Sequence, residues 1–111
     1  MLRRALIMLA LNATVAGVAS ADCADPQNQA EINQCAGDQY QAADAKLKSS
    51  YKELVASIDN NWEASLRSAQ RAWVSFRDAE CEFESMGWEG GTGRSAVQAG
   101  CFARMTNDRT K

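Results

Sequence analysis

Apolar residues recur three or four positions apart along two long segments of this chain, and this spacing most limits the folds open to it. Such spacing puts the residues on one face of an α-helix, whereas a strand needs strict alternation. β-Branched residues are few, and helix-forming residues dominate. The sequence therefore predicts an all-α protein in which two long helices pack as an antiparallel hairpin. The first stripe is Ile32, Cys35, Ala36, Tyr40, Ala43, Leu47, Tyr51, Leu54 and Ile58, and the second is Trp62, Leu66, Ala69, Trp73, Phe76 and Phe83.

Capping and turn residues give the expected ends of these two helices. Asn28, with Glu31 three residues later, resembles a capping box and predicts a helix start near Asn28. The polar segment 57–61 predicts the turn, and the second helix is expected from about Asn61 to Met86. Trp62 and Trp73 lie on the apolar stripe and are expected in the core.

A glycine-rich segment follows the second helix. Residues 88–94 read W-E-G-G-T-G-R, and three glycines in four residues predict a loop. Ser95 is expected to open a short third helix that folds back on the hairpin, with Val97, Cys101 and Met105 on one face.

The four cysteines predict two disulfides. Four cysteines allow three pairings, and we favour Cys23–Cys35 with Cys81–Cys101 because each joins neighbouring segments. The competing interpretation is a metal site, but the chain has no His and no C-x-x-C, and its cysteines are widely spaced. We therefore expect no metal and no cofactor, and each bridge should add about 3 kcal/mol of stability.

The N-terminal segment has the features of an export signal. Arg3 and Arg4 precede the apolar run 5–18, and Ala19-Ser20-Ala21 is a small-residue cleavage site. We expect residues 1–21 to be a signal peptide and residues 22–111 a single helical domain that is periplasmic or secreted. Asp22 precedes the first cysteine, where lipid attachment needs a small residue, so no lipoprotein is expected. The apolar run is too short to form a stable membrane span. After its cleavage, no stable membrane insertion of the domain is expected.

The charge of the expected domain limits its partners. All 14 acidic residues follow residue 21, whereas Arg3 and Arg4 are among the 12 basic ones, so the domain is more acidic than the whole chain, whose formal net charge is −2. An acidic surface disfavours nucleic acid and favours basic proteins. The end of the second helix is locally acidic. This cluster is either a patch for a basic partner or simply a solvated face. Its members are Asp78, Glu80, Glu82, Glu84 and Glu89.

Several short motifs together resemble a known family. They are Gln70-Arg71-Ala72-Trp73, then Arg77-Asp78-x-x-Cys81, with Asp44-x-x-Leu47-x-x-x-Tyr51 before them and Thr106-x-x-Arg109 after them. This order, with the export signal and the four cysteines, resembles the LprI-like lysozyme-inhibitor family of small secreted or periplasmic bacterial proteins. The resemblance implies a helical, disulfide-bonded module and inhibition of c-type lysozyme.

Two groups of residues are candidates for function. Loop residues on a rigid scaffold often bind partners, so the candidate binding residues are Trp88, Glu89, Thr92, Arg94 and Ser95; the alternative is a plain connector with Trp88 packed back on the helices. A second, polar group is expected to be structural, with Arg77 paired to a carboxylate such as Asp44 or Glu80 across the hairpin. Its members are Asp44, Gln70, Arg77, Glu80 and Arg109.

Catalysis is not expected. The chain has no His to act as a general base, and no cysteine stays free if both disulfides form. The G-G-T-G segment does not join a strand to a helix, so it is not a phosphate-binding loop. The sequence thus predicts a non-catalytic binding module. Its acidic charge favours a basic envelope or host protein as partner, and the family resemblance implies a c-type lysozyme. The alternative is an envelope interaction or stress protein without a lysozyme target.

Overall fold

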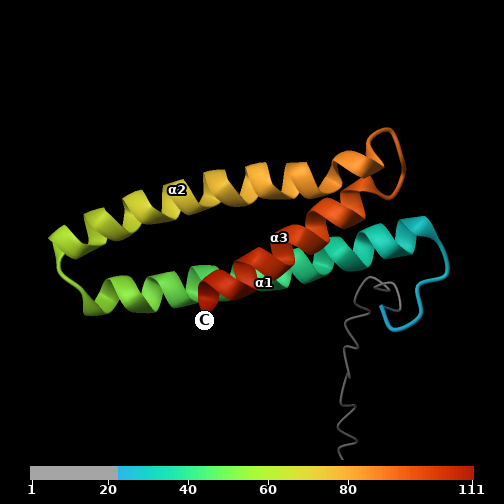
Figure 1. Cartoon of the computed structure of the whole chain (residues 1–111). Helices are drawn as coiled ribbons and strands as arrows, with labels where there is room; N and C mark the ends of the chain where they lie inside the picture. The colour runs from blue at the N-terminus through green and yellow to red at the C-terminus, as the bar shows by residue number, and fades with distance from the viewer. Residues whose placement is uncertain (1–22) are drawn as a thin grey trace, which may run out of the picture.

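Three α-helices and one short 3-10 turn make up the fold. The computed structural model describes residues 23–111, in which α1 spans Gln29–Ser57, α2 spans Asn60–Ser85 and α3 spans Arg94–Thr110 (Figure 1). The turn η1 spans Met86–Trp88. No strand occurs among these residues, so the all-α prediction is confirmed. The expected signal peptide, residues 1–21, lies outside the described residues.

Side-chain caps fix where α1 and α2 begin. Asn28 accepts a hydrogen bond from the backbone N–H of Glu31 at 2.9 Å, and the Glu31 carboxylate accepts one from the N–H of Gln27 at 2.6 Å. Asp59 accepts one from the N–H of Trp62 at 3.0 Å. These caps satisfy amides that have no partner inside the helix. Because Asp59 is the cap, α2 begins at Asn60, one residue earlier than predicted.

The glycine-rich loop reverses the chain within a few residues. Gly90 has a φ of 77°, a left-handed conformation that residues with a side chain rarely adopt. A Cβ on Gly91 would lie only 3.1 Å from the carbonyl oxygen of Trp88. The loop is slightly shorter than predicted, because Trp88 ends η1 and Arg94 already opens α3.

Helix α3 lies between the two arms of the hairpin. It packs along α1 over most of its length and against α2 near the loop, whereas α1 and α2 have little direct contact. Figure 1 shows α3, in orange and red, crossing from the loop end of α2 to the side of α1. The expected hairpin is present, but its arms are bridged by α3 and do not pack directly on each other.

Small side chains make this close packing possible. The buried apolar residues of the described chain are Cys35, Ala43, Cys81, Cys101 and Ala103. The distance between packed helices depends on the side chains at their contact, and α1 and α3 bury only small apolar side chains such as Ala43 and Ala103. The core is therefore a thin seam, with none of the tryptophans fully buried in it.

Both predicted disulfides are present. Cys23 is joined to Cys35, and Cys81 to Cys101, each with a Cα–Cα distance of 5.5 Å. The first ties the N-terminal arm to α1, and the second ties α2 to α3. The favoured pairing is confirmed.

The expectation that Trp62 is a core residue is wrong. Trp62 is 70% exposed, and Phe83, on the same predicted stripe, is also 70% exposed. The face of α2 that meets α3 instead carries Arg77, Cys81 and Ser85, which are buried at four-residue spacing. This face is rotated from the apolar stripe, and α3 does not extend far enough to reach Trp62. Trp73 is half-buried.

Removing the Cys81–Cys101 bridge should free α3. Replacing both cysteines by Ala is expected to lower the free energy of unfolding by about 3 kcal/mol, measured by urea denaturation, and to speed hydrogen exchange along α3. The matched control replaces Cys23 and Cys35 by Ala, which releases only the N-terminal arm and should leave the α3 amides protected. Equal loss of α3 protection in both variants would contradict this role.

Candidate functional site

The loop end of the molecule exposes most of the predicted binding residues. Trp88 is 54% exposed, and the side chains of Glu89, Thr92 and Ser95 are also exposed, whereas Arg94 is half-buried. One aromatic group, one carboxylate and two hydroxyls thus face solvent within eight residues of chain. Exposed aromatic and polar groups of this kind are typical of a binding surface.

Contacts at both ends hold this loop in place. The Trp88 ring lies against Gly93, since a Cβ on Gly93 would be 3.3 Å from a ring carbon. The Asn33 side chain of α1 donates a hydrogen bond to the carbonyl of Thr92 at 3.0 Å. The Arg94 Nε donates to the buried Ser85 hydroxyl at 3.4 Å. The loop is therefore attached to α1 and to the end of α2.

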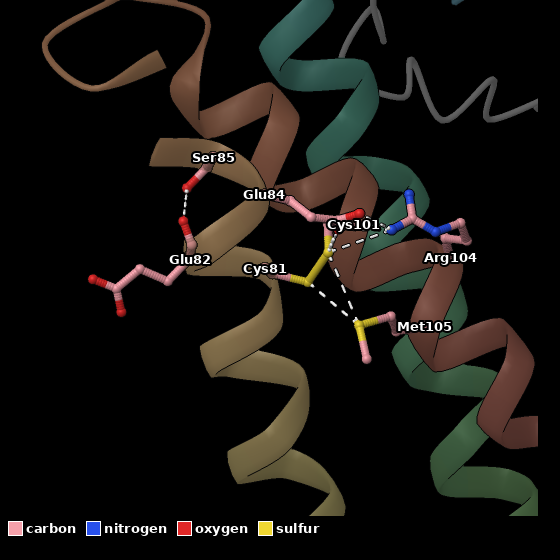
Figure 2. Close-up of polar contacts among 7 residues, drawn as sticks. All are labelled: Cys81, Glu82, Glu84, Ser85, Cys101, Arg104 and Met105. Carbon is pink, nitrogen blue, oxygen red and sulfur yellow. Dashed lines mark hydrogen bonds and ion pairs between the residues drawn. A yellow bond between two sulfur atoms is a disulfide. The ribbon is translucent and has the colours of Figure 1, made fainter. Parts of the chain in front are cut away.

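The Cys81–Cys101 disulfide forms the base of this end (Figure 2). Arg104 donates to both carboxylate oxygens of Glu84, at 2.9 and 2.7 Å, and so links α3 to α2 a second time. The Glu84 carboxylate also contacts the Cys101 sulfur, and the Met105 sulfur lies 3.7 Å from that of Cys81. The Ser85 hydroxyl donates to the carbonyl of Glu82 at 2.9 Å, which caps this turn of α2.

This cluster is covalent and not metal-binding. The ligand atoms of Cys81, Glu84 and Cys101 lie within 4.8 Å of one another. A metal would need thiolates, and both sulfurs are bonded to each other. The arrangement therefore acts as a structural staple.

The acidic end of α2 is partly neutralised by neighbours. Asp78 pairs with Arg77 and Glu84 pairs with Arg104. Glu82 and Glu89 are exposed and form no ion pair within residues 23–111, and Glu80 is half-buried. Net negative charge therefore remains beside the loop, mainly on Glu82 and Glu89.

Arg77 occupies an aromatic cage at the centre of the fold. Its guanidinium carbon lies 5.5 Å from the ring centroid of Tyr40, 5.3 Å from that of Trp73 and 5.0 Å from that of Phe102. These rings come from all three helices. A guanidinium over aromatic faces is stabilised by the ring quadrupole, more so when water is excluded, and Arg77 is only 8% exposed.

The predicted polar network divides into separate pairs. Arg77 bonds to its neighbour Asp78, with Nε and a terminal nitrogen 3.0 and 2.9 Å from one oxygen, and not to Asp44 or Glu80. Arg109 donates to Gln70 at 3.1 Å and lies over the Trp73 ring.

Asp44 is paired within its own helix. Its carboxylate lies 2.8 Å from Lys48, and this hydrogen bond raises the pKa of Lys48 above its ordinary value. Asp44 is one helical turn from Lys48, which is a short-range pairing, so it takes no part in holding Arg77.

Three residues of these sites were missed in the sequence. Tyr40 was expected only as a stripe residue, and Phe102 and Asn33 not at all. No local pattern identifies them, because each acts on a partner far along the chain. A buried arginine does, however, indicate that partners must exist.

Comparison with known proteins agrees with this architecture. The family described as "Lysozyme inhibitor LprI" matches residues 19–111. The chain belongs to the LprI lysozyme-inhibitor family. It is also 34% identical over 102 residues to an uncharacterised protein of Rhizobium meliloti (strain 1021), covering 80% of this chain and 73% of that one. No solved structure shows significant similarity to the chain.

The LprI family is named for inhibition, so membership supports binding to lysozyme and gives no support to catalysis. The disulfides and the family favour an extracellular or periplasmic setting. Among residues 23–111, no helix combines the length and the apolar character needed to cross a membrane.

Arg77 is expected to stabilise the fold, and this stabilisation should depend on the planar shape of its guanidinium group. Arg77→Ala should lower the free energy of unfolding by about 3 kcal/mol, because it leaves a cavity between three rings and an unpaired Asp78. Arg77→Lys keeps the charge but loses the planar stack, so an intermediate loss is expected. Urea denaturation measures both, and the exposed Arg71→Ala serves as control, with a change within about 0.5 kcal/mol. Wild-type stability of Arg77→Ala would show that the cage contributes nothing.

Proposed function

We propose that this protein inhibits a c-type lysozyme through the loop end of the molecule. Membership of the LprI family supports the class of target. The observation that carries the site is the exposed Trp88 on a loop held at its base by the Cys81–Cys101 bridge. A rigid protruding loop loses little conformational entropy on binding.

Charge favours the encounter. Lysozyme of the c-type is strongly basic, and Glu82 and Glu89 leave negative charge beside the loop. Complementary charges speed association and orient the partners. The acidic end of α2 would therefore meet the basic body of the enzyme, while the loop faces its cleft.

The loop carries groups suited to a cleft that contains two catalytic carboxylates. The exposed hydroxyls of Thr92 and Ser95 are hydrogen-bond donors for such carboxylates. Arg94 is held by Ser85 through Nε, and its other N–H groups remain suited to a carboxylate. Trp88 supplies the large apolar contact typical of an interface hot spot.

The lysis of a cell-wall suspension by c-type lysozyme tests this proposal. The purified oxidised protein should lower the rate, and Trp88→Ala should raise the inhibition constant at least tenfold, as expected for a hot-spot tryptophan. The matched control is Trp62→Ala, another exposed tryptophan far from the loop, which should inhibit like the wild type. The double variant Glu82→Lys with Glu89→Lys should inhibit more weakly. Its inhibition should also depend less on salt concentration, because the attraction that salt screens has been removed.

Full lysozyme activity at a large molar excess of inhibitor would refute the proposal. In that case the non-catalytic envelope interaction expected as the alternative becomes the better hypothesis. Capture of one non-lysozyme protein from the periplasm, unaffected by Trp88→Ala and Arg94→Ala, would identify it.

We also propose that residues 1–21 direct export and are removed. Expression of the full chain should yield a periplasmic or secreted protein whose N-terminus, read by mass spectrometry, is Asp22. Ala19→Arg with Ala21→Arg should block cleavage, since the cleavage site needs small residues. An uncleaved wild-type chain in the cytoplasm would contradict this.

A further inference from the structure

The half of α2 next to the loop carries an apolar stripe that faces solvent. The stripe consists of Ala72, Phe76, Ala79, Phe83 and Met86, which recur four and three positions apart. All five are exposed, and the three large side chains are 58%, 70% and 58% exposed in chain order. This alternating spacing is that of a helix face that packs against another surface. We call these five residues the outer stripe.

The outer stripe lies opposite the face of α2 that packs inside the molecule. At about 100° per residue, its centre is roughly 180° from the buried face formed by Arg77, Cys81 and Ser85. Helix α3 lies against that buried face (Figure 1). In the described part of the chain, no helix covers the outer stripe. Its phenyl rings therefore have no role in holding the three helices together.

The outer stripe adjoins the loop. Met86 begins the turn η1 and Trp88 ends it, so the exposed apolar side chains continue from α2 to the loop without a break in the chain. Exposed apolar patches with a polar rim are typical of protein interaction sites. A stable interface uses about 20–30 residues of each partner, many more than the loop 88–94 provides. The outer stripe supplies the additional area.

Charge decides which kind of partner fits. Glu80 and Glu82 occupy the two positions directly beside the stripe, between its phenyl rings, and neither forms an ion pair within residues 23–111. Between Arg71 and Arg94 the sequence has one basic residue, Arg77, and it is buried on the opposite face. Two copies of the stripe would place carboxylates against carboxylates, which is unfavourable. Anionic lipid would be repelled as well, whereas a basic protein surface would be attracted.

We propose that the outer stripe and the loop form one two-part interface for a basic protein. Trp88 and its loop would face the cleft of the enzyme, while Phe76 and Phe83 pack on the basic body beside it. Glu80 and Glu82 would then pair with lysines or arginines of that body. The inference rests on the proposed function for the identity of this partner, a c-type lysozyme.

Calorimetric titration of the purified oxidised protein with a c-type lysozyme tests the inference, because it measures binding separately from lysis. Phe76→Ala with Phe83→Ala should raise the dissociation constant about tenfold or more. The heat-capacity change of binding should become less negative, because less apolar surface is buried. The matched control is Trp62→Ala, which is 70% exposed like Phe83 but lies at the other end of α2, and it should bind like the wild type.

A second variant tests the charges without removing apolar surface. Glu80→Gln with Glu82→Gln should bind more weakly at low salt and depend less on salt concentration, because fewer attractive charges remain to be screened. Circular dichroism and urea denaturation check that each variant is folded. If the phenylalanine variant does not fold, the glutamine variant decides the test, and wild-type affinity at every salt concentration would overturn the inference.

The remaining outcomes separate the inference from the proposed function. If the wild type inhibits lysozyme, and the phenylalanine variant binds it with unchanged affinity and heat capacity, the outer stripe has no role and only the inference fails. If the wild type binds lysozyme through Phe76 and Phe83 but does not slow lysis, the stripe is a surface for basic proteins and only the inhibitor function fails. A wild-type protein that does not bind lysozyme overturns both.

Discussion

The bond between Cys81 and Cys101 holds α3 where it can touch both arms of the hairpin, and the tertiary structure depends on this placement. Because α1 and α2 have little contact with each other, α3 is the element that connects them. The ion pair of Arg104 with Glu84 and the sulfur contact of Met105 lie around the same bond. A short helix that would be marginal alone thus becomes the centre of the fold.

The Arg77 cage explains how so thin a core accommodates a charge. Tyr40, Trp73 and Phe102 surround the guanidinium, and Asp78 accepts two of its hydrogen bonds. A lone buried charge would be costly, but the rings and the carboxylate together replace its hydration. The long stem of Arg77 also fills space between helices that small residues leave.

Local signals predicted the elements well, and distant contacts were poorly predicted. The cap at Asn28, the glycines of the loop, and the spacing of the cysteines each act within a few residues or join neighbouring segments, so they could be read directly, whereas the cap at Asp59 was not predicted. The position of α3 between the arms could not, because it depends on which faces of α1 and α2 accept a third helix. The misplacement of Trp62 in the core followed from assuming direct packing of the arms. The expected pairing of Arg77 across the hairpin failed for the same reason, while Asn33 and Phe102 act only through partners far along the chain.

The loop between Ser85 and Arg94 is anchored at both ends by groups that lie outside it. Of the disulfide, Cys81 lies four residues before Ser85 and Cys101 lies seven residues after Arg94. Asn33 binds only the backbone carbonyl of Thr92. Apart from Trp88, whose ring lies against Gly93, and the conformationally restricted Gly90 and Gly91, the residues between these anchors therefore contribute little to the fold. Related chains are free to diversify this segment under selection by their targets while the helices stay constant, much as hypervariable loops diverge on a constant framework.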